Sequence, residues 1–274
     1  MTQPSPAQQP ADVVLAERRG PVLLLILNRP DTLNAWNNAL EDRYFDLLDQ
    51  ADADPDVRAI VVTGAGRGFC SGADMNDLQQ VDRLDENGLP MRSRPKSHPL
   101  SVRKPLIAAI NGAAAGLGLV EALFCDVRFA AAGAKLTTSF ARRGLIAEYG
   151  AAWLLPRLVG QSRALDLLVS GRVVRAEEGL QMGLVDHVVD RDQVVDAAVA
   201  YAQDLATHCS PWAMSTIKRQ VYASMETSLA EASTEADRLM QVSLLGPDVR
   251  EGVLSYLEGR PPAFPGLGEA GAPT

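Results

Sequence analysis

The chain has 274 residues, 47% of them apolar, which predicts one large globular domain with a substantial core, with or without an appendage. Its 26 Lys and Arg residues against 34 Asp and Glu residues give a net charge of −8, which disfavours nucleic acid or an anionic membrane as a partner. The 3 cysteines are unclustered, so they indicate neither a disulfide framework nor a cysteine metal site.

The first residues predict no targeting signal. Residues 1–10 are rich in Pro, Gln and Ser, which is typical of a disordered tail and not of a secretory signal. No stretch approaches the roughly 18 continuous apolar residues of a membrane-spanning helix. We therefore expect a soluble, cytoplasmic protein.

Extended and helical patterns alternate over residues 11–206. The apolar runs Val13–Glu17 and Val22–Leu27 flank a turn and predict a hairpin. Asn37 offers an N-cap for the helix that follows. Further strands are predicted at Arg58–Thr63, Leu106–Ile110, Val127–Ala130, Lys135–Thr138 and Leu184–Val188. Strands that alternate with helices indicate an α/β layered core.

The composition changes near residue 207. From Asp190 onward the patterns are helical, at Val194–Leu205, Pro211–Tyr222, Leu229–Leu244 and Val249–Leu257. We interpret residues 207–265 as a helical oligomerisation region and residues 266–274 as a frayed tail. Earlier in the chain, prolines, an Asn-Gly pair and six basic side chains in Asp82–Lys104 predict a mobile loop.

Two glycine-rich segments, Thr63–Asp74 and Asn111–Gly118, each follow a β-branched apolar run and precede a helical pattern. Such a turn leaves backbone N–H groups unpaired at the start of a helix, where the helix dipole is positive. Two such amides that converge on one oxygen would form an oxyanion hole. The sequence therefore predicts one anion site built from both segments. Cys70 lies beside it, and we interpret this thiol as a buried packing residue.

Four motifs carry a resemblance to the crotonase family, also called the enoyl-CoA hydratase/isomerase family. In chain order they are Leu27–Pro30, Phe69–Met75, Ile110–Gly118 and Cys125-Asp126. The resemblance implies a spiral core of repeated β-β-α units, a C-terminal helical trimerisation region, and a homotrimer or dimer of trimers. It also implies an acyl-CoA thioester substrate, with coenzyme A as part of the substrate. No other cofactor and no metal are expected.

Residue by residue, the resemblance places Ala73 and Leu117 where backbone amides form the family's oxyanion hole. The family usually has glycine at position 117, so the Leu117 side chain could narrow the acyl pocket. The residues that the resemblance places beside coenzyme A are Leu33, Asn34, Ala35, Gly72, Asp74, Met75, Tyr256 and Arg260. For the Asp74 carboxylate we favour a helix cap over acid–base chemistry. The basic residues of the predicted loop either meet coenzyme A phosphates or are solvated: Arg92, Arg94, Lys96, Arg103 and Lys104.

The carboxylates distinguish activities within the family. Its hydratases hold water between two glutamates, and this chain has Val120 and Phe140 at those positions. Glu121 is one residue away from the first, but one step along a helix turns a side chain by about 100°, so we expect a structural role. Glu148 precedes the helical motif Trp153–Pro156. That arrangement resembles the single acid of the Δ3,Δ2-enoyl-CoA isomerase branch.

These residues predict an acyl-CoA enzyme in which the Ala73 and Leu117 amides stabilise a thioester enolate while Glu148 moves the proton. A double-bond isomerase is favoured. The alternatives are an enoyl-CoA hydratase of fatty-acid β-oxidation, and a noncatalytic CoA-binding or scaffolding protein in which Glu148 is a solvated loop residue.

Overall fold

Two sheets form the core of the computed structural model, which describes residues 13–74 and 92–268. The larger sheet has the order β1 (Val14–Arg19), β2 (Val22–Leu27), β3 (Ala59–Gly64), β5 (Leu106–Ile110), β7 (Val127–Ala131), β10 (His187–Val189). The smaller has the order β4 (Gly68–Cys70), β6 (Ala113–Ala115), β8 (Lys135–Thr137), β9 (Val174–Arg175). Each pair β3-β4, β5-β6 and β7-β8 gives one strand to each sheet, which is the spiral of repeated units that the family resemblance implies.

The predicted hairpin is confirmed. β1 and β2 pair antiparallel from Val14 opposite Leu27 to Arg19 opposite Val22. β2, β3, β5 and β7 then run parallel. β3 and β5 are buried along their whole length, as near-continuous apolar strands of a parallel sheet are. The last strand of this sheet starts at His187 and not at Leu184, because Leu184 and Val185 pack in the core as a connection after a helix.

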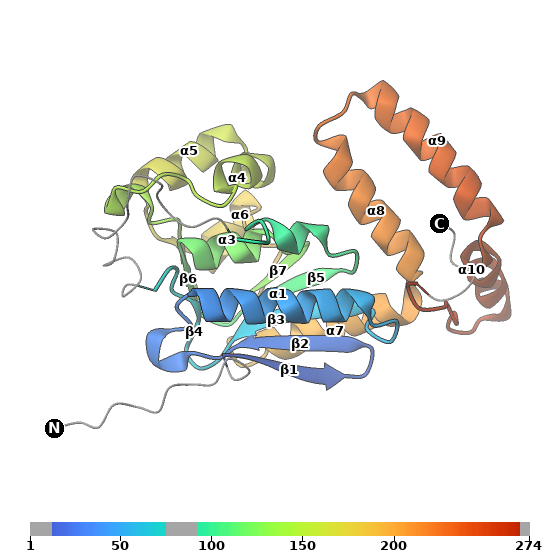
Figure 1. Cartoon of the computed structure of the whole chain (residues 1–274), viewed down its shortest axis with the longest axis horizontal. Helices are drawn as coiled ribbons and strands as arrows, with labels where there is room; N and C mark the ends of the chain where they lie inside the picture. The colour runs from blue at the N-terminus through green and yellow to red at the C-terminus, as the bar shows by residue number, and fades with distance from the viewer. Residues whose placement is uncertain (1–12, 75–91, 269–274) are drawn as a thin grey trace.

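Helices surround the sheets (Figure 1). α1 (Asn38–Ala53) begins after Asn37, whose side chain accepts a hydrogen bond from the Leu40 amide at 3.0 Å, as predicted for its N-cap. α7 (Val194–His208) packs along β2, β3, β5 and β7. The shorter helices of the core are α3 (Leu117–Leu123), α4 (Ala151–Val159), α5 (Gln161–Ser170) and α6 (Ala176–Met182).

Three C-terminal helices extend away from the core (Figure 1). They are α8 (Pro211–Ser224), α9 (Leu229–Leu245) and α10 (Pro247–Glu258). The Asp126 carboxylate, at the start of β7, anchors α8 by accepting hydrogen bonds from Lys218 Nζ at 2.8 Å and the Tyr222 hydroxyl at 3.2 Å. Several large apolar side chains on α9 and α10 are exposed, among them Leu229, Leu245 and Leu257. Across the described ranges, no helix is both long and apolar enough to cross a bilayer.

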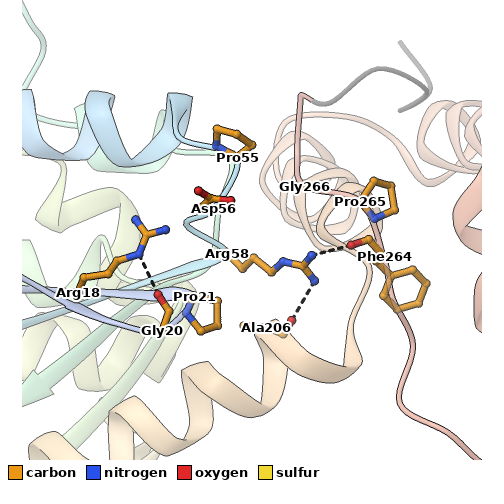
Figure 2. Close-up of a pocket in the computed structure, with 10 residues that line it drawn as sticks. All are labelled: Arg18, Gly20, Pro21, Pro55, Asp56, Arg58, Ala206, Phe264, Pro265 and Gly266. Carbon is orange, nitrogen blue, oxygen red and sulfur yellow. Dashed lines mark hydrogen bonds between the residues drawn. The ribbon is translucent and has the colours of Figure 1, made fainter.

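The end of the described chain folds back onto the core (Figure 2). The Arg58 guanidinium donates hydrogen bonds to the Ala206 carbonyl at 3.2 Å and to the Phe264 carbonyl at 2.6 Å. Phe264 and Leu267 are each only 8% exposed. The prediction of a frayed tail from residue 266 is therefore wrong for residues 266–268, because apolar burial and Arg58 hold this segment. Residues 269–274 and the predicted tail 1–10 lie outside the described residues.

The predicted mobile loop also differs from the structure. Its described part, residues 92–104, contains a 3-10 turn at His98–Ser101 and packs against α1. Its basic side chains meet the acidic face of α1: Arg92 pairs with Asp42, Arg94 with Asp46 and Asp49, and Arg103 with Asp52. Lys104 is buried and donates to the Ala51 carbonyl. These side chains are therefore held against α1, and their contact with coenzyme A phosphates stays a prediction.

Candidate active site

Close backbone packing brings the two glycine-rich segments together at the carboxyl ends of β4 and β6, which run parallel. A Cβ on Gly72 would lie 2.8 Å from the Ala115 carbonyl oxygen and 3.7 Å from the Leu117 nitrogen. A Cβ on Gly118 would lie 2.6 Å from Cys70 Cβ. Only glycine permits both approaches, so these two positions set the spacing between the turns that carry Ala73 and Leu117.

The amides of Ala73 and Leu117 are left without acceptors in the part of the chain that the structure describes. Trp36 pairs with Ala73 in a parallel bridge that uses the Gly72 carbonyl and the Asp74 amide. The Ala73 N–H therefore points away from Trp36, as alternate amides of a strand do. Leu117 is the first residue of α3, where an N–H has no partner within the helix. Its side chain is buried in the core.

The segment predicted to lie beside coenzyme A, Leu33 to Ala35, is held against the turn at Gly72. The Leu33 carbonyl accepts a hydrogen bond from the Ser71 amide at 3.0 Å. The Asn34 side chain is fully buried and donates to the carbonyls of Ala65, Gly68 and Phe69 at 2.9–3.1 Å. Its role in the structure is therefore to fix the turn, which leaves the main chain of this segment for any ligand contact.

Replacing Asn34 by alanine tests this scaffold. The change leaves the carbonyls of Ala65, Gly68 and Phe69 without their donor, and it puts alanine at a φ of 57°, which asparagine tolerates better. We expect a loss of about 1–3 kcal/mol in the free energy of unfolding, measured by urea denaturation. An unfolding curve that coincides with that of the unmodified protein would contradict this assignment. Asn38→Ala, on the exposed first turn of α1, is the matched control.

Asp74 is bound to Arg29, a residue that the sequence reasoning missed as part of the site. The Arg29 guanidinium lies 2.8 Å from the Asp74 carboxylate and also donates to the Ala35 carbonyl. Both side chains of the pair are largely buried. Arg29 therefore ties the Ala35 segment to the turn that carries Ala73. Arg29 belongs to the Leu27–Pro30 motif, which was the available signal. Met75 lies outside the described residues.

Glu148 sits in the loop between β8 and α4. Its carbonyl accepts a hydrogen bond from the Ala151 amide at 2.9 Å at the start of α4. The next residue, Tyr149, has a φ of 53°, a left-handed conformation that is costly for a bulky side chain. The Glu148 side chain is half-buried, and this burial raises its pKa, while the charge of Lys96 opposes the rise. A carboxyl whose pKa is raised by burial holds a proton more firmly, as a proton shuttle requires.

The two positions that hold glutamate in the family's hydratases are apolar and buried. Val120 is 1% exposed and Phe140 is 5% exposed. Phe140 stands beside the turn at Gly116, where an added Cβ would lie 3.9 Å from the ring. Glu121 is 2% exposed, and burial and the charge of Glu41 on α1 raise its pKa well above the usual range. No hydrogen-bond partner for its carboxyl is found among the residues described.

Tyr256 and Arg260 are not brought to this site within one chain. Figure 1 shows α10 at the far end of the molecule from β4 and β6. Tyr256 is 85% exposed. Arg260 is paired with Glu251 and Glu258, and the hydrogen bonds that Glu251 accepts from Arg260 and from the Ala263 amide lower the Glu251 pKa to about 2.

Among the described residues, neither a reactive thiol nor a cluster of metal ligands is found at this site. Burial raises the pKa of Cys70 to about 12, which makes the thiol inert at neutral pH. In residues 13–74 and 92–268, no group of three or more His, Cys, Asp and Glu side chains is placed to hold a metal ion.

A cavity of about 570 Å³ lies near Arg18, Arg58 and Phe264, at the amino ends of the parallel strands (Figure 2). Ligand sites of parallel sheets lie at the opposite, carboxyl ends.

The chain is similar to known proteins over nearly its whole length. The family model described as Enoyl-CoA hydratase/isomerase matches residues 17–267. The chain is 36% identical to 1,2-epoxyphenylacetyl-CoA isomerase of Escherichia coli over 261 residues, covering 93% of this chain and 99% of that protein. It is 34% identical to 2,3-dehydroadipyl-CoA hydratase of Escherichia coli, covering 92% and 98%.

Solved structures of related proteins have a similar fold. A probable enoyl-CoA hydratase/isomerase from Mycobacterium abscessus superposes with a TM-score of 0.82 at 31% identity, covering 93% of this chain and 99% of that one. The sequence match and this likeness of fold extend from the hairpin through the C-terminal helices. The chain therefore belongs to the enoyl-CoA hydratase/isomerase, or crotonase, family.

Proposed function

We propose that the protein is an enoyl-CoA double-bond isomerase. In this proposal the Ala73 and Leu117 amides bind the thioester oxygen, and Glu148 removes a proton from one carbon and returns it two carbons away. The observation that carries the proposal is the set of residues at the three acid positions. Val120 and Phe140 are buried and apolar, whereas Glu148 is a half-buried carboxyl next to the start of α4.

One acid is sufficient for isomerisation. Removing a proton beside a thioester carbonyl moves charge to the carbonyl oxygen, so amides fixed at that oxygen stabilise the transition state more than the ground state. A single base can then deliver the proton along the same allylic face. Hydration also needs a water molecule that is oriented and activated, for which a second acid is usual.

Hydration is the second candidate, because the chain is similar to both an isomerase and a hydratase over more than nine-tenths of its length. A purified sample offered a 3-enoyl-CoA should form the conjugated 2-enoyl-CoA, seen as a rise in ultraviolet absorbance. The same sample offered a 2-enoyl-CoA should lose that absorbance slowly or not at all. The reverse pattern would establish hydration. Tight acyl-CoA binding in calorimetry with neither reaction would indicate the noncatalytic alternative.

The proposed active form is a homotrimer or a dimer of trimers that binds an acyl-CoA thioester. The exposed apolar side chains of α8 to α10 support self-association, because a patch of this kind marks an interface. The distance of Tyr256 and Arg260 from Ala73 is also explained if these residues reach coenzyme A in a neighbouring copy. Sedimentation of the purified protein should then give three or six times the 29.3 kDa mass of the chain, and a monomer would contradict this part of the proposal.

A further inference from the structure

A buried acid on α1 connects the two parts of the candidate site. Glu41 is 1% exposed, and its carboxylate contacts three nitrogen donors: it accepts one hydrogen bond and forms two ion pairs. These are Trp36 Nε1 at 3.0 Å, Arg92 Nε at 2.9 Å and Lys96 Nζ at 2.5 Å. A carboxylate removed from water needs such partners to stay ionised. Glu41 thus holds the Arg92 and Lys96 side chains in place.

One set of contacts links Glu41 to the candidate oxyanion site. The Trp36 indole is held by Glu41, and the Trp36 backbone pairs with the strand at Ala73. The Trp36 amide donates to the Gly72 carbonyl at 2.8 Å, and the Trp36 carbonyl accepts from the Asp74 amide at 2.9 Å. Glu41 is therefore two contacts away from the Ala73 amide.

A second set of contacts links Glu41, through Lys96, to the loop that carries Glu148. Lys96 Nζ lies 5.2 Å from the centre of the Tyr149 ring, within the range of a cation–π contact. Tyr149 follows Glu148 directly in the left-handed turn. The Lys96 side chain is only 28% exposed, so its charge is partly shielded from solvent. The Lys96 charge lowers the pKa of Glu148 against the larger effect of burial.

We infer that Lys96, held by Glu41, is a positioning residue that orients the Glu148 loop for proton transfer through its contact with Tyr149. This inference rests on the proposed role of Glu148. The other charged groups near this loop are Glu41 on α1, Glu121 on α3 and Arg92, and each of them acts on the adjacent Tyr149. Lys96 is the described cation whose charge acts on Glu148 itself.

The two ends of the ion pair have opposite effects on Glu148. Without the Lys96 charge, burial acts unopposed, so the Glu148 pKa rises and less of the base form is present at a given pH. Without the Glu41 charge, Lys96 is no longer neutralised, so its attraction for Glu148 strengthens and the Glu148 pKa falls. If Lys96 and Glu41 had only structural roles, replacing them would not shift the Glu148 pKa in opposite directions.

The test is a pH titration of the Glu148 carboxyl carbon by ¹³C NMR in the ligand-free protein, with the signal assigned by its absence in Glu148→Gln. Lys96→Gln keeps a donor for Glu41 but removes the charge, and its midpoint should lie above that of the unmodified protein. Lys96→Arg should restore the original midpoint. Glu41→Gln should shift it to lower pH. Lys135→Gln, on an exposed site of β8, should leave it unchanged.

The pH profile of isomerisation provides the second readout. The acidic limb of kcat/KM should move in the same directions as the NMR midpoints. A midpoint in Lys96→Gln that is equal to or below the original would overturn the inference. If Lys96→Gln does not fold, an unchanged or raised midpoint in Glu41→Gln would do the same. An inactive protein whose Glu148 midpoint still responds to Lys96 would count against the proposed reaction and not against this electrostatic link.

Discussion

Glu148→Gln is expected to lower kcat for isomerisation of a 3-enoyl-CoA by about 10²- to 10⁴-fold, the usual contribution of a general acid–base group. The amide fills the same space but cannot accept and return a proton. KM should change little, because the amides of Ala73 and Leu117 and the segment Leu33 to Ala35 are unaltered. Initial rates across a substrate series measure both constants.

Glu226→Gln, at an exposed turn after α8, is the matched control and should keep full activity. Thermal unfolding of both variants should resemble that of the unmodified protein. An unchanged kcat in Glu148→Gln would remove the central residue of the proposal. Because burial raises the pKa of Glu148, activity of the unmodified protein should fall with decreasing pH at a pH above the usual range of a glutamate. The base form is lost there.

Gly118→Ala is expected to have the second large effect. The new methyl would lie 2.6 Å from Cys70 Cβ and closer still to the Cys70 carbonyl, so α3 must move away from β4. Overpacking of this kind costs about 1–3 kcal/mol of stability. Displacing the Leu117 amide from the thioester oxygen should lower kcat by about 10²- to 10³-fold, the usual loss for one oxyanion donor.

Gly252→Ala, within α10, is the matched control. A Cβ on residue 252 would make only an ordinary contact of 3.7 Å with the Phe264 ring. That variant should be as stable as the unmodified protein or slightly more so, since alanine favours a helix. Urea denaturation and the isomerase assay compare the two. If Gly118→Ala kept both its stability and its kcat, the close approach of α3 and β4 would not determine the site.

Local sequence patterns were sufficient for much of the fold. The hairpin, the strands β3, β5 and β7, and the helix after Asn37 follow from apolar runs, turn residues and a capping side chain. The C-terminal helices also lie where their spacing predicts. The crotonase-like α/β spiral itself came from the resemblance, because β4, β6 and β8 have three residues each and no periodicity can be read from such short strands.

The parts that could not be predicted depend on contacts between distant segments. Nothing near Lys96 or Arg92 in the sequence indicates that both meet Glu41, about fifty positions earlier, so the local pattern predicts only a mobile loop. Arg58 fixes the segment at Phe264 in the same long-range way. For the site, glycine spacing predicted that two turns would meet, whereas the side chains around Glu148 became visible only in three dimensions.

The backbone origin of the two candidate donors has a consequence for divergence. A peptide N–H is present whatever side chain its residue carries, so the two donors at positions 73 and 117 do not depend on side-chain identity as long as the glycines beside them hold the main chain. In the proposed enzyme, carbonyl activation is thereby uncoupled from the choice of acyl group. New specificities can arise by reshaping the cavity wall without rebuilding the catalytic apparatus.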